Sequence, residues 1–450
     1  MIALGTVAYR LEARQGTDAE GFWTAHRSLS GWSLGMSLCA SMLSVSWSLV
    51  YGVELFYRYG WGSTWLLGLP WLIVLALFFL LAPRLRSFGA FSQGELFGKE
   101  YGPQIQALTV FVLSIVFLTW CGAEIAAGAQ VLAPTLGIPA SWLMVVIALV
   151  VASYSWAGGF RAVVLTDVTQ FLLILAFFLY LGQKTLVYPA TFTSLSSAPG
   201  PSPALILTSL GVYITGWLAE ADIWLRLTAA KDHRHARLAM GFALAVSLFV
   251  VLLFPAWLGA VARTLFPEPA QLQQPALVAL LGRLLVGRAH FLVVGGLLGV
   301  ALSTVSTTAN VVAVTWARDW PWRCAHGSNT LAGARWVSAL AVLAALPVAL
   351  LARSLTELFY LSGGLLSAGL FWPTLGLFLP SWRKAAIAAA QVGLPVLLLA
   401  FILERSGLWR FSADPGLMAL GVSYILPALA AGGLAFAGVL LFGKEKPVLR

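Results

Sequence analysis

The amino-acid sequence predicts an all-α polytopic membrane protein, and three observations support this prediction. Apolar residues make up 60% of the 450-residue chain and charged residues only 10%, whereas a soluble domain is about half apolar and about a quarter charged. The apolar residues form twelve segments, each near the length of about 20 residues that a helix needs to cross a bilayer. Two of these segments, five spans apart, carry groups that weaken a helix, which points to an inverted repeat of five plus five spans.

The spans follow one another with polar linkers between them. Met1–Tyr9 is apolar but too short to span, and it lacks the cleavage pattern of a signal peptide. Leu265–Arg288 is a mixed external segment with room for a short helix. The expected spans are Leu29–Phe56, Trp61–Ala82, Ile105–Leu132, Ser141–Trp156, Ala162–Leu181, Ala204–Leu225, Ala236–Val261, His290–Trp316, Gly333–Leu351, Leu358–Leu379, Ala385–Ile402 and Leu417–Phe442.

The distribution of Lys and Arg indicates the orientation. If both ends are cytoplasmic, 19 of the 27 basic residues lie inside and 8 lie outside, which agrees with the excess of positive charge on cytoplasmic loops. This bias accounts for the net charge of +10 without a nucleic-acid partner. We therefore expect an integral protein of the cytoplasmic (inner) membrane, embedded in the lipid bilayer as a single domain over residues 1–450. The oligomeric state is not indicated by the sequence.

Enzyme and metal-protein classes find no support. The cysteines Cys39, Cys121 and Cys324 lack the spacing of metal ligands. The chain contains no Gly-rich phosphate loop and no arrangement of a nucleophile with its base. We therefore expect no catalytic residue, no cofactor and no metal beyond a monovalent cation.

The span at His290–Trp316 contains an uncharged stretch rich in hydroxyls, GGLLGVALSTVSTTAN. Gly295, Gly299, Ser303 and Thr307 recur every four residues and so share one helix face. Small residues on one face allow a second helix to approach closely, with Gly295 and Gly299 at the contact. Ser303 and Thr304 either bond to carbonyls one turn back or line a small-cation site, since neutral oxygen ligands suit a monovalent ion that must also leave.

Two other spans carry features of interrupted helices. In the first, Ser37, Ser41, Ser44 and Ser48 lie on one face, as either a packing face or a break whose carbonyls face a cavity. The sixth has Gly216 in YITGWLAEAD. Folds of this kind bind substrate and ion at the midplane between interrupted helices.

Six acidic residues lie in apolar surroundings, where an ionisable group is expensive and points to function. Asp167 follows Arg161 by six residues, so either a structural pair or an ion role is open. Glu220 and Asp222 are expected to form a cytoplasmic charge cluster with Arg226 and Lys231. Glu124 either serves as a proton or substrate partner or caps a helix bend. The six are Glu54, Glu124, Asp167, Glu220, Asp222 and Glu357.

Five segments, in order, resemble the sodium:solute symporter family over nearly the whole chain. They are GFWTAHRSLSGW, FGAFSQGELFGKEYG, YSWAGGFRAVVLTDVTQ, RLTAAKDHRHAR and GVALSTVSTTANVVAVTWARD. The resemblance implies a LeuT-like five-plus-five inverted repeat with additional flanking helices. Residues 29–380 would form the ten-helix core of a single transporter domain and residues 383–442 two C-terminal helices. Met1–Tyr9 would be the remnant of a leading helix.

The resemblance also implies sodium-coupled symport of a small organic solute by alternating access. Its motifs carry a sodium site onto the carbonyls of Ala40, Leu43 and Val300 and the hydroxyls of Ser303 and Thr304. Asp167 matches an acid that assists a second cation or a proton in some members.

The solute pocket departs from the family patterns. The resemblance assigns solute binding to Ser46, Trp47, Tyr213, Gly216 and Trp217. Met42 stands where some amino-acid-transporting members have an acid, and TWLLGLP in the second span lacks the polar groups used for sugars. These departures favour a small solute that is partly apolar or contacts aromatic rings, since aromatic faces bind apolar or cationic groups.

Two alternatives to sodium symport remain. The same fold could couple to protons, with Asp167 or Glu124 as the carrier. The second alternative is a sensor with a transporter-like core. Family members of that kind usually carry appended signalling domains, whereas only Gly443–Arg450 follows the last span here.

Overall fold

A computed structural model describes residues 19–90, 92–188, 193–268, 272, 274–284, 290–320, 331–351 and 354–442. Within these ranges the regular secondary structure is helical, and one isolated bridge joins Leu29 and Ala230. Eleven helices are long and apolar enough to cross a membrane, and a bent helix pair brings the number to twelve. The predicted all-α polytopic membrane protein is therefore confirmed. Met1–Tyr9 and Cys324 lie outside the described residues.

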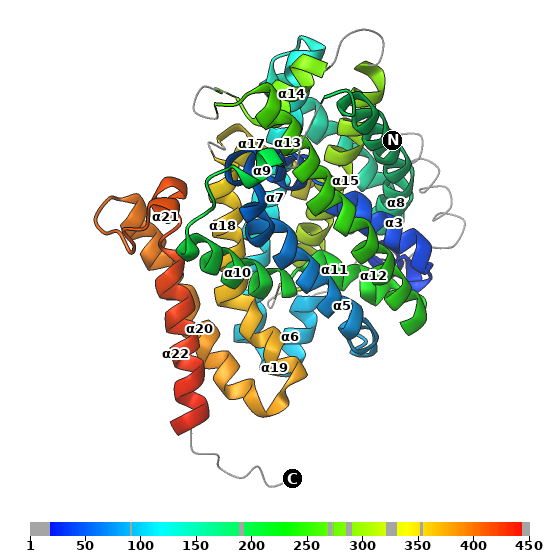
Figure 1. Ribbon diagram of the computed structural model, residues 1–450. Helices are drawn as coiled ribbons and strands as arrows, with labels where there is room; N and C mark the ends of the chain where they lie inside the picture. The colour runs from blue at the N-terminus through cyan, green and yellow to red at the C-terminus, as the bar shows by residue number, and fades with distance from the viewer. Residues whose placement is uncertain are drawn as a thin grey trace.

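The helices form one bundle, with α14 at one end and α22 along one edge (Figure 1). The predicted short helix in the external segment is α14. In chain order, the helices of the spans and linkers are α2 (Ala19–Thr24), α3 (Gly31–Met42), η2 (Val45–Tyr51), α4 (Gly52–Tyr59), η4 (Thr64–Gly68), α5 (Leu69–Ser87), α6 (Gln93–Tyr101), α7 (Pro103–Leu136), α8 (Ala140–Thr185), α9 (Thr193–Ser196), α10 (Pro203–Leu218), α11 (Ala221–Ala229), α12 (His233–Ser247), η5 (Leu248–Leu253), α13 (Phe254–Leu265), α14 (Ala276–Leu284), α15 (His290–Arg318), α16 (Leu331–Ala344), α17 (Leu346–Leu351), α18 (Leu355–Leu366), η7 (Ser367–Phe371), α19 (Trp372–Phe378), α20 (Arg383–Arg405), α21 (Pro415–Leu420) and α22 (Ile425–Phe442).

The first span is interrupted where the serine-rich stretch predicted a break. Helix α3 ends at Met42, and the chain resumes at Val45 with a bend of 58°. Ser44 caps the second half, because its Oγ accepts a hydrogen bond from the Trp47 amide at 2.9 Å. The break leaves the carbonyls in the last turn of α3 without amide partners from their own helix.

The sixth span is also interrupted, but not at the predicted residue. Helix α10 runs through Gly216 to Leu218, and α11 starts at Ala221. Gly216 serves a different purpose, since a Cβ atom there would lie 2.7 Å from the carbonyl oxygen of Gly363 on α18. The absence of a side chain at Gly216 lets the two helices touch.

The eighth span, α15, crosses the middle of the bundle and contacts α3, α7 and α8. The expectation that Gly295 makes the close helix contact is wrong. No atom lies within 4 Å of a Cβ built at Gly295, whereas one at Gly296 would lie 2.3 Å from the Phe177 side chain on α8. Gly299 makes only ordinary van der Waals contacts with α8. The close approach is therefore one residue away from the predicted face.

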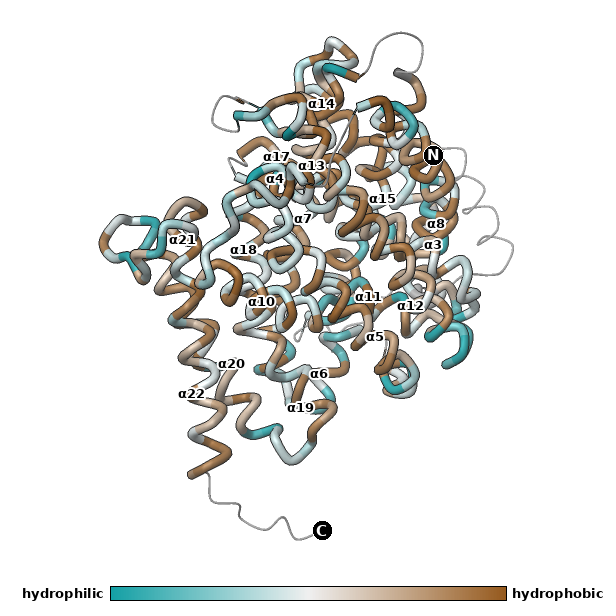
Figure 2. The backbone as a smooth tube through the Cα atoms, viewed as in Figure 1, coloured by the Kyte–Doolittle hydropathy of each residue, from teal (hydrophilic) through white to brown (hydrophobic). Residues whose placement is uncertain are grey.

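The last two spans pack against each other at the edge of the bundle (Figure 1). The twelfth starts at Ile425 and not near Leu417, because Gly421 takes a left-handed conformation (φ 62°) that ends the short helix α21. Leu434, Leu441 and Phe442 are exposed on α22, and the helix is hydrophobic along its length (Figure 2). Such a surface suits contact with lipid chains.

Candidate functional site

A cavity of about 70 Å³ lies between the two interrupted spans. Residues from the first, second, third, sixth, eighth and tenth spans line it, so it is the meeting point of helices distant in sequence. The lining residues are Ser41, Met42, Ser44, Ser46, Trp47, Trp71, Phe117, Trp120, Tyr213, Trp217, Glu220, Asp222, Thr304, Thr307, Thr308 and Phe359.

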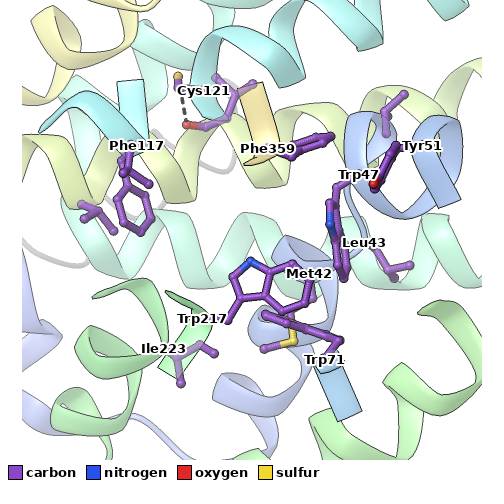
Figure 3. Packing of buried hydrophobic residues seen from close by; sticks show 14 of the residues in the cluster. Met42, Leu43, Trp47, Tyr51, Trp71, Phe117, Cys121, Trp217, Ile223 and Phe359 are labelled. Carbon is purple, nitrogen blue, oxygen red and sulfur yellow. Dashed lines mark hydrogen bonds between the residues drawn. The ribbon is translucent and has the colours of Figure 1, made fainter. Parts of the chain in front are cut away.

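Aromatic rings dominate the wall of this cavity. Trp47 and Trp71 meet edge to face with ring centroids 5.2 Å apart, and Trp217 lies 5.1 and 4.8 Å from them in the same manner. Tyr213 stacks on Trp217 at 4.3 Å. Figure 3 shows Trp47, Trp71 and Trp217 gathered around Met42. The rings belong to three spans and form one continuous surface.

Four of the five residues predicted to bind solute share this cavity. Ser46, Trp47, Tyr213 and Trp217 line it. Gly216 does not, because it faces Gly363 on α18. Solute binding by the other four stays a prediction.

Glu124 on α7 caps the second half of the first span. Its carboxylate accepts hydrogen bonds from Ser44 Oγ at 2.6 Å, Val45 N at 2.7 Å, Ser46 N at 3.0 Å and Ser46 Oγ at 2.7 Å. Glu124 is fully buried. The amides of Val45 and Ser46 can only donate, so the Glu124 carboxyl group accepts from both of them. Of the roles left open for Glu124, these contacts favour the helix cap.

The two hydroxyls of α15 singled out by the sequence face different partners. Thr304 Oγ1 lies 3.1 Å from the carbonyl oxygen of Ser41 and 3.2 Å from that of Val300. Ser303 Oγ donates to Asp167 Oδ1 at 2.6 Å. Thr304 therefore joins α15 to the last turn of α3, and Ser303 joins α15 to α8. Ala40 and Leu43 lie in the same buried turn, before the break.

Asp167 and Arg226 form a buried ion pair that sequence spacing did not suggest. Arg226 Nη2 lies 3.2 Å from Asp167 Oδ2, and Nη1 lies 3.1 Å from Asp222 Oδ2. The guanidinium also donates to Thr307 Oγ1 at 2.7 Å and to Ser37 Oγ at 3.1 Å. This partner of Asp167 is thus 59 residues away, on α11.

Of the charge cluster expected around Glu220 and Asp222, the pair of Asp222 with Arg226 is present, and it is buried. Glu220 and Asp222 have 9% and 4% of their surface exposed, and both line the cavity beside the break in the sixth span. The four-residue spacing of Asp222 and Arg226 on a helix was the usable signal.

Comparisons with known proteins agree with the family resemblance found in the sequence. The model of the sodium:solute symporter family matches residues 22–198. A sodium/pantothenate symporter of Haemophilus influenzae is 32% identical over 154 residues, which cover 33% of this chain and 32% of the relative. A sodium/glucose cotransporter 4 of Danio rerio is 25% identical over 309 residues, covering 59% and 45%. The resemblance to the sodium:solute symporter family is confirmed.

The likeness in fold to a solved structure covers nearly the whole chain. A substrate-bound, outward-open structure of a Na⁺-coupled sialic acid symporter superposes with a TM-score of 0.76 at 17% identity, covering 98% of this chain and 96% of the other. This likeness supports the LeuT-like fold. In sequence, by contrast, the chain spans about a third of the pantothenate symporter and less than half of the glucose cotransporter, at 32% and 45% of their lengths.

Proposed function

We propose that this protein is a secondary active transporter that couples sodium entry to uptake of a small organic solute by alternating access. Sodium would bind to the carbonyls of Ala40, Leu43 and Val300 and the hydroxyls of Ser303 and Thr304. The solute would bind in the aromatic cavity next to the break in the first span. The fold and the family resemblance support a transporter that is embedded in the lipid bilayer.

The observation that carries this proposal is the position of Thr304. Its hydroxyl lies between a carbonyl of α3, just before the break, and a carbonyl of its own helix, at 3.1 and 3.2 Å. Helix carbonyls in a last turn carry partial negative charge and suit a cation. Ser303 is one residue away and is bonded to Asp167, so a carboxylate lies in the second layer of ligands and favours positive charge there.

Sodium explains these contacts better than proton coupling does. Asp167 accepts from Ser37, Ser303 and Arg226, and Glu124 accepts from four donors. A proton on either carboxyl would compete with these donors. Neutral hydroxyls and carbonyls are the ligands that a monovalent cation needs when it must also dissociate.

The membrane orientation is part of the same proposal. The excess of basic residues on one side supports cytoplasmic ends and a place in the cytoplasmic membrane. Residues 29–380 would move as the transport core, with 383–442 packed at its edge.

Sodium binding can be tested before the solute is known. Sodium should raise the thermal stability of the purified full chain relative to equal potassium, since a ligand that binds the folded state stabilises it by mass action. Ser303→Ala and Thr304→Ala should raise the half-saturating sodium concentration by roughly tenfold or more, the equivalent of about 1.4 kcal/mol.

Thr109→Ala is the matched control for these variants. Thr109 is a buried hydroxyl on α7 that bonds only to the carbonyl one turn back, so its loss should leave the sodium dependence as in the wild type. If both α15 variants kept the wild-type sodium dependence, the proposed site would be wrong. A stabilisation by acid pH in place of sodium would favour proton coupling.

A further inference from the structure

The central cavity contains two carboxylates that sodium-coupled transport does not use. We propose that the transported solute carries a positive charge, as an amine or a quaternary ammonium group. Because this names the solute of the proposed symporter, it rests on the proposed function. Three features of the cavity support it: unpartnered acidic oxygens, aromatic faces and a helix end closed to anions.

The acidic oxygens come from the break in the sixth span. Glu220 is the residue before α11, yet its side chain makes no capping bond to that helix. Glu220 Oε2 and Asp222 Oδ1 are buried and accept no hydrogen bond from an N–H or O–H donor among the described residues, and the two carboxyl groups interact with each other. A buried polar atom without a partner is costly, and a bound cation would remove that cost at both atoms.

Arg226 pairs with one of these acids, Asp222, but leaves the unpartnered oxygens of both free of it. Arg226 reaches only the Oδ2 atom of Asp222, and its remaining donors go to Asp167, Thr307 and Ser37. Among the described residues that line the cavity, none is Lys or Arg. The wall therefore presents negative charge that is not balanced within the cavity.

The aromatic faces provide the second feature. Trp47, Trp71 and Trp217 pack together at the cavity wall with centroids about 5 Å apart. A cation over such a ring gains up to about 2 kcal/mol when both are removed from water. Several rings around one volume also bind the methyl or methylene groups that surround an ammonium nitrogen, so rings and acids together select an organic cation.

The break in the first span provides the third feature. A free helix N-terminus binds anions through its amides and its dipole. Here the amides of Val45 and Ser46 already donate to the Glu124 carboxylate. An anionic solute group would have to displace Glu124 or lie beside its negative charge. This end of the cavity therefore excludes anions.

The experiment uses matched pairs of solutes on the purified full chain in sodium. Choline is compared with 3,3-dimethylbutan-1-ol, which has the same shape without the charge, and tetramethylammonium and simple primary amines extend the cationic set. Glycine betaine and a carboxylate analogue provide the zwitterionic and anionic arms. Thermal stabilisation and quenching of tryptophan fluorescence report binding. We expect at least one cation to bind at millimolar concentration or below, and its neutral isostere to bind at least tenfold more weakly.

The variant Glu220→Gln keeps the shape of the side chain and removes its charge. It should weaken cation binding by about tenfold or more while leaving the sodium-induced stabilisation in place, which shows that the variant is folded. Glu100→Gln is the control, because Glu100 pairs with Arg383 on the surface away from the cavity. Trp217→Leu should also weaken binding, and Trp217→Phe less so, because Phe retains a ring.

The possible failures separate the two proposals. If sodium stabilises the protein but only neutral, zwitterionic or anionic solutes bind, or if no cation binds, the solute class is wrong and sodium coupling stands. Equal binding of choline and its neutral isostere would also mean that the solute class is wrong while sodium coupling stands. If sodium has no effect relative to potassium, the proposed function itself fails.

Discussion

The two interrupted spans differ in how their acidic residues are satisfied. At the first break, Glu124 receives four hydrogen bonds from Ser44, Val45 and Ser46. At the second break, Glu220 and Asp222 each keep an oxygen without a partner among the described residues. Both breaks border the same cavity, so the difference lies in the donors supplied and not in the degree of burial.

This difference separates a structural carboxylate from one available to a ligand. A buried carboxylate with a full set of donors stabilises the bend that it caps, as Glu124 does. A buried carboxylate that lacks donors stores a cost that only a ligand or a proton removes. In a repeat of five plus five spans, the two halves can therefore perform different tasks with the same backbone feature.

The largest expected effect on the free energy of unfolding comes from replacing Arg226, which pairs with Asp222 beside the second break. Arg226→Met leaves Asp167 and Asp222 buried without their cation, and breaking a buried pair of this kind costs about 3–5 kcal/mol. Thermal unfolding of the purified protein should show the loss. Adding Asp167→Asn should recover part of it. A loss below about 1 kcal/mol would mean that Arg226 does not hold these acids in place.

The second effect compares the two breaks directly with isosteric variants. Glu124→Gln replaces an accepting oxygen with an amide that cannot accept from the Val45 or Ser46 amides, so it should cost about 2–3 kcal/mol. Glu220→Gln should stay within about 1 kcal/mol of the wild type in the absence of solute, since Oε2 has no partner to lose. Equal losses in thermal unfolding would remove the distinction between the breaks.

Much of this arrangement could be predicted from the sequence. Apolar length gave the spans, and the serines before Trp47 marked the first break, because hydroxyls and a cap are local features. Gly216 was misassigned since glycine marks both weak helices and close contacts, and only the neighbouring Gly363 decides between them. The shift from Gly295 to Gly296 has the same origin, because the closest contact depends on the crossing geometry of α8.

The charge pairs could not be predicted for a different reason. Asp167 and Arg226 are 59 residues apart, and Glu124 is 80 residues from Ser44. Nothing in local periodicity links such positions, so their partners depend on the three-dimensional packing. The sequence did indicate that acids inside apolar spans need a partner or a function. The structure supplies partners for both Asp167 and Glu124.

Two aspartates outside the spans allow the same comparison of burial and hydrogen bonding through their pKa values. Asp319 follows the end of α15 and is buried, with Ser92 Oγ donating to its carboxylate. Burial raises the pKa of Asp319 to about 7, although the Ser92 hydroxyl opposes this shift. Asp232 is exposed at the start of α12, where the His235 amide and side chain lower its pKa to about 2. Burial thus outweighs hydrogen bonding at Asp319, whereas hydrogen bonding determines the shift at the exposed Asp232.

The smallest expected effect is the pH dependence that Asp319 imposes. Its folded-state pKa of about 7 exceeds its ordinary value of 3.8, so between these values the folded protein binds a proton that the unfolded chain releases. The free energy of unfolding should therefore fall as pH rises from about 4 to 7, by at most about 1.4 kcal/mol per pH unit, and level off above. Asp319→Asn should flatten this slope in thermal unfolding. Asp232→Asn should leave the slope between pH 4 and 7 unchanged, because the pKa of Asp232 is shifted downward and the stability that this carboxylate contributes is lost only as pH falls below about 4. An unchanged slope between pH 4 and 7 in Asp319→Asn would show that another group titrates there.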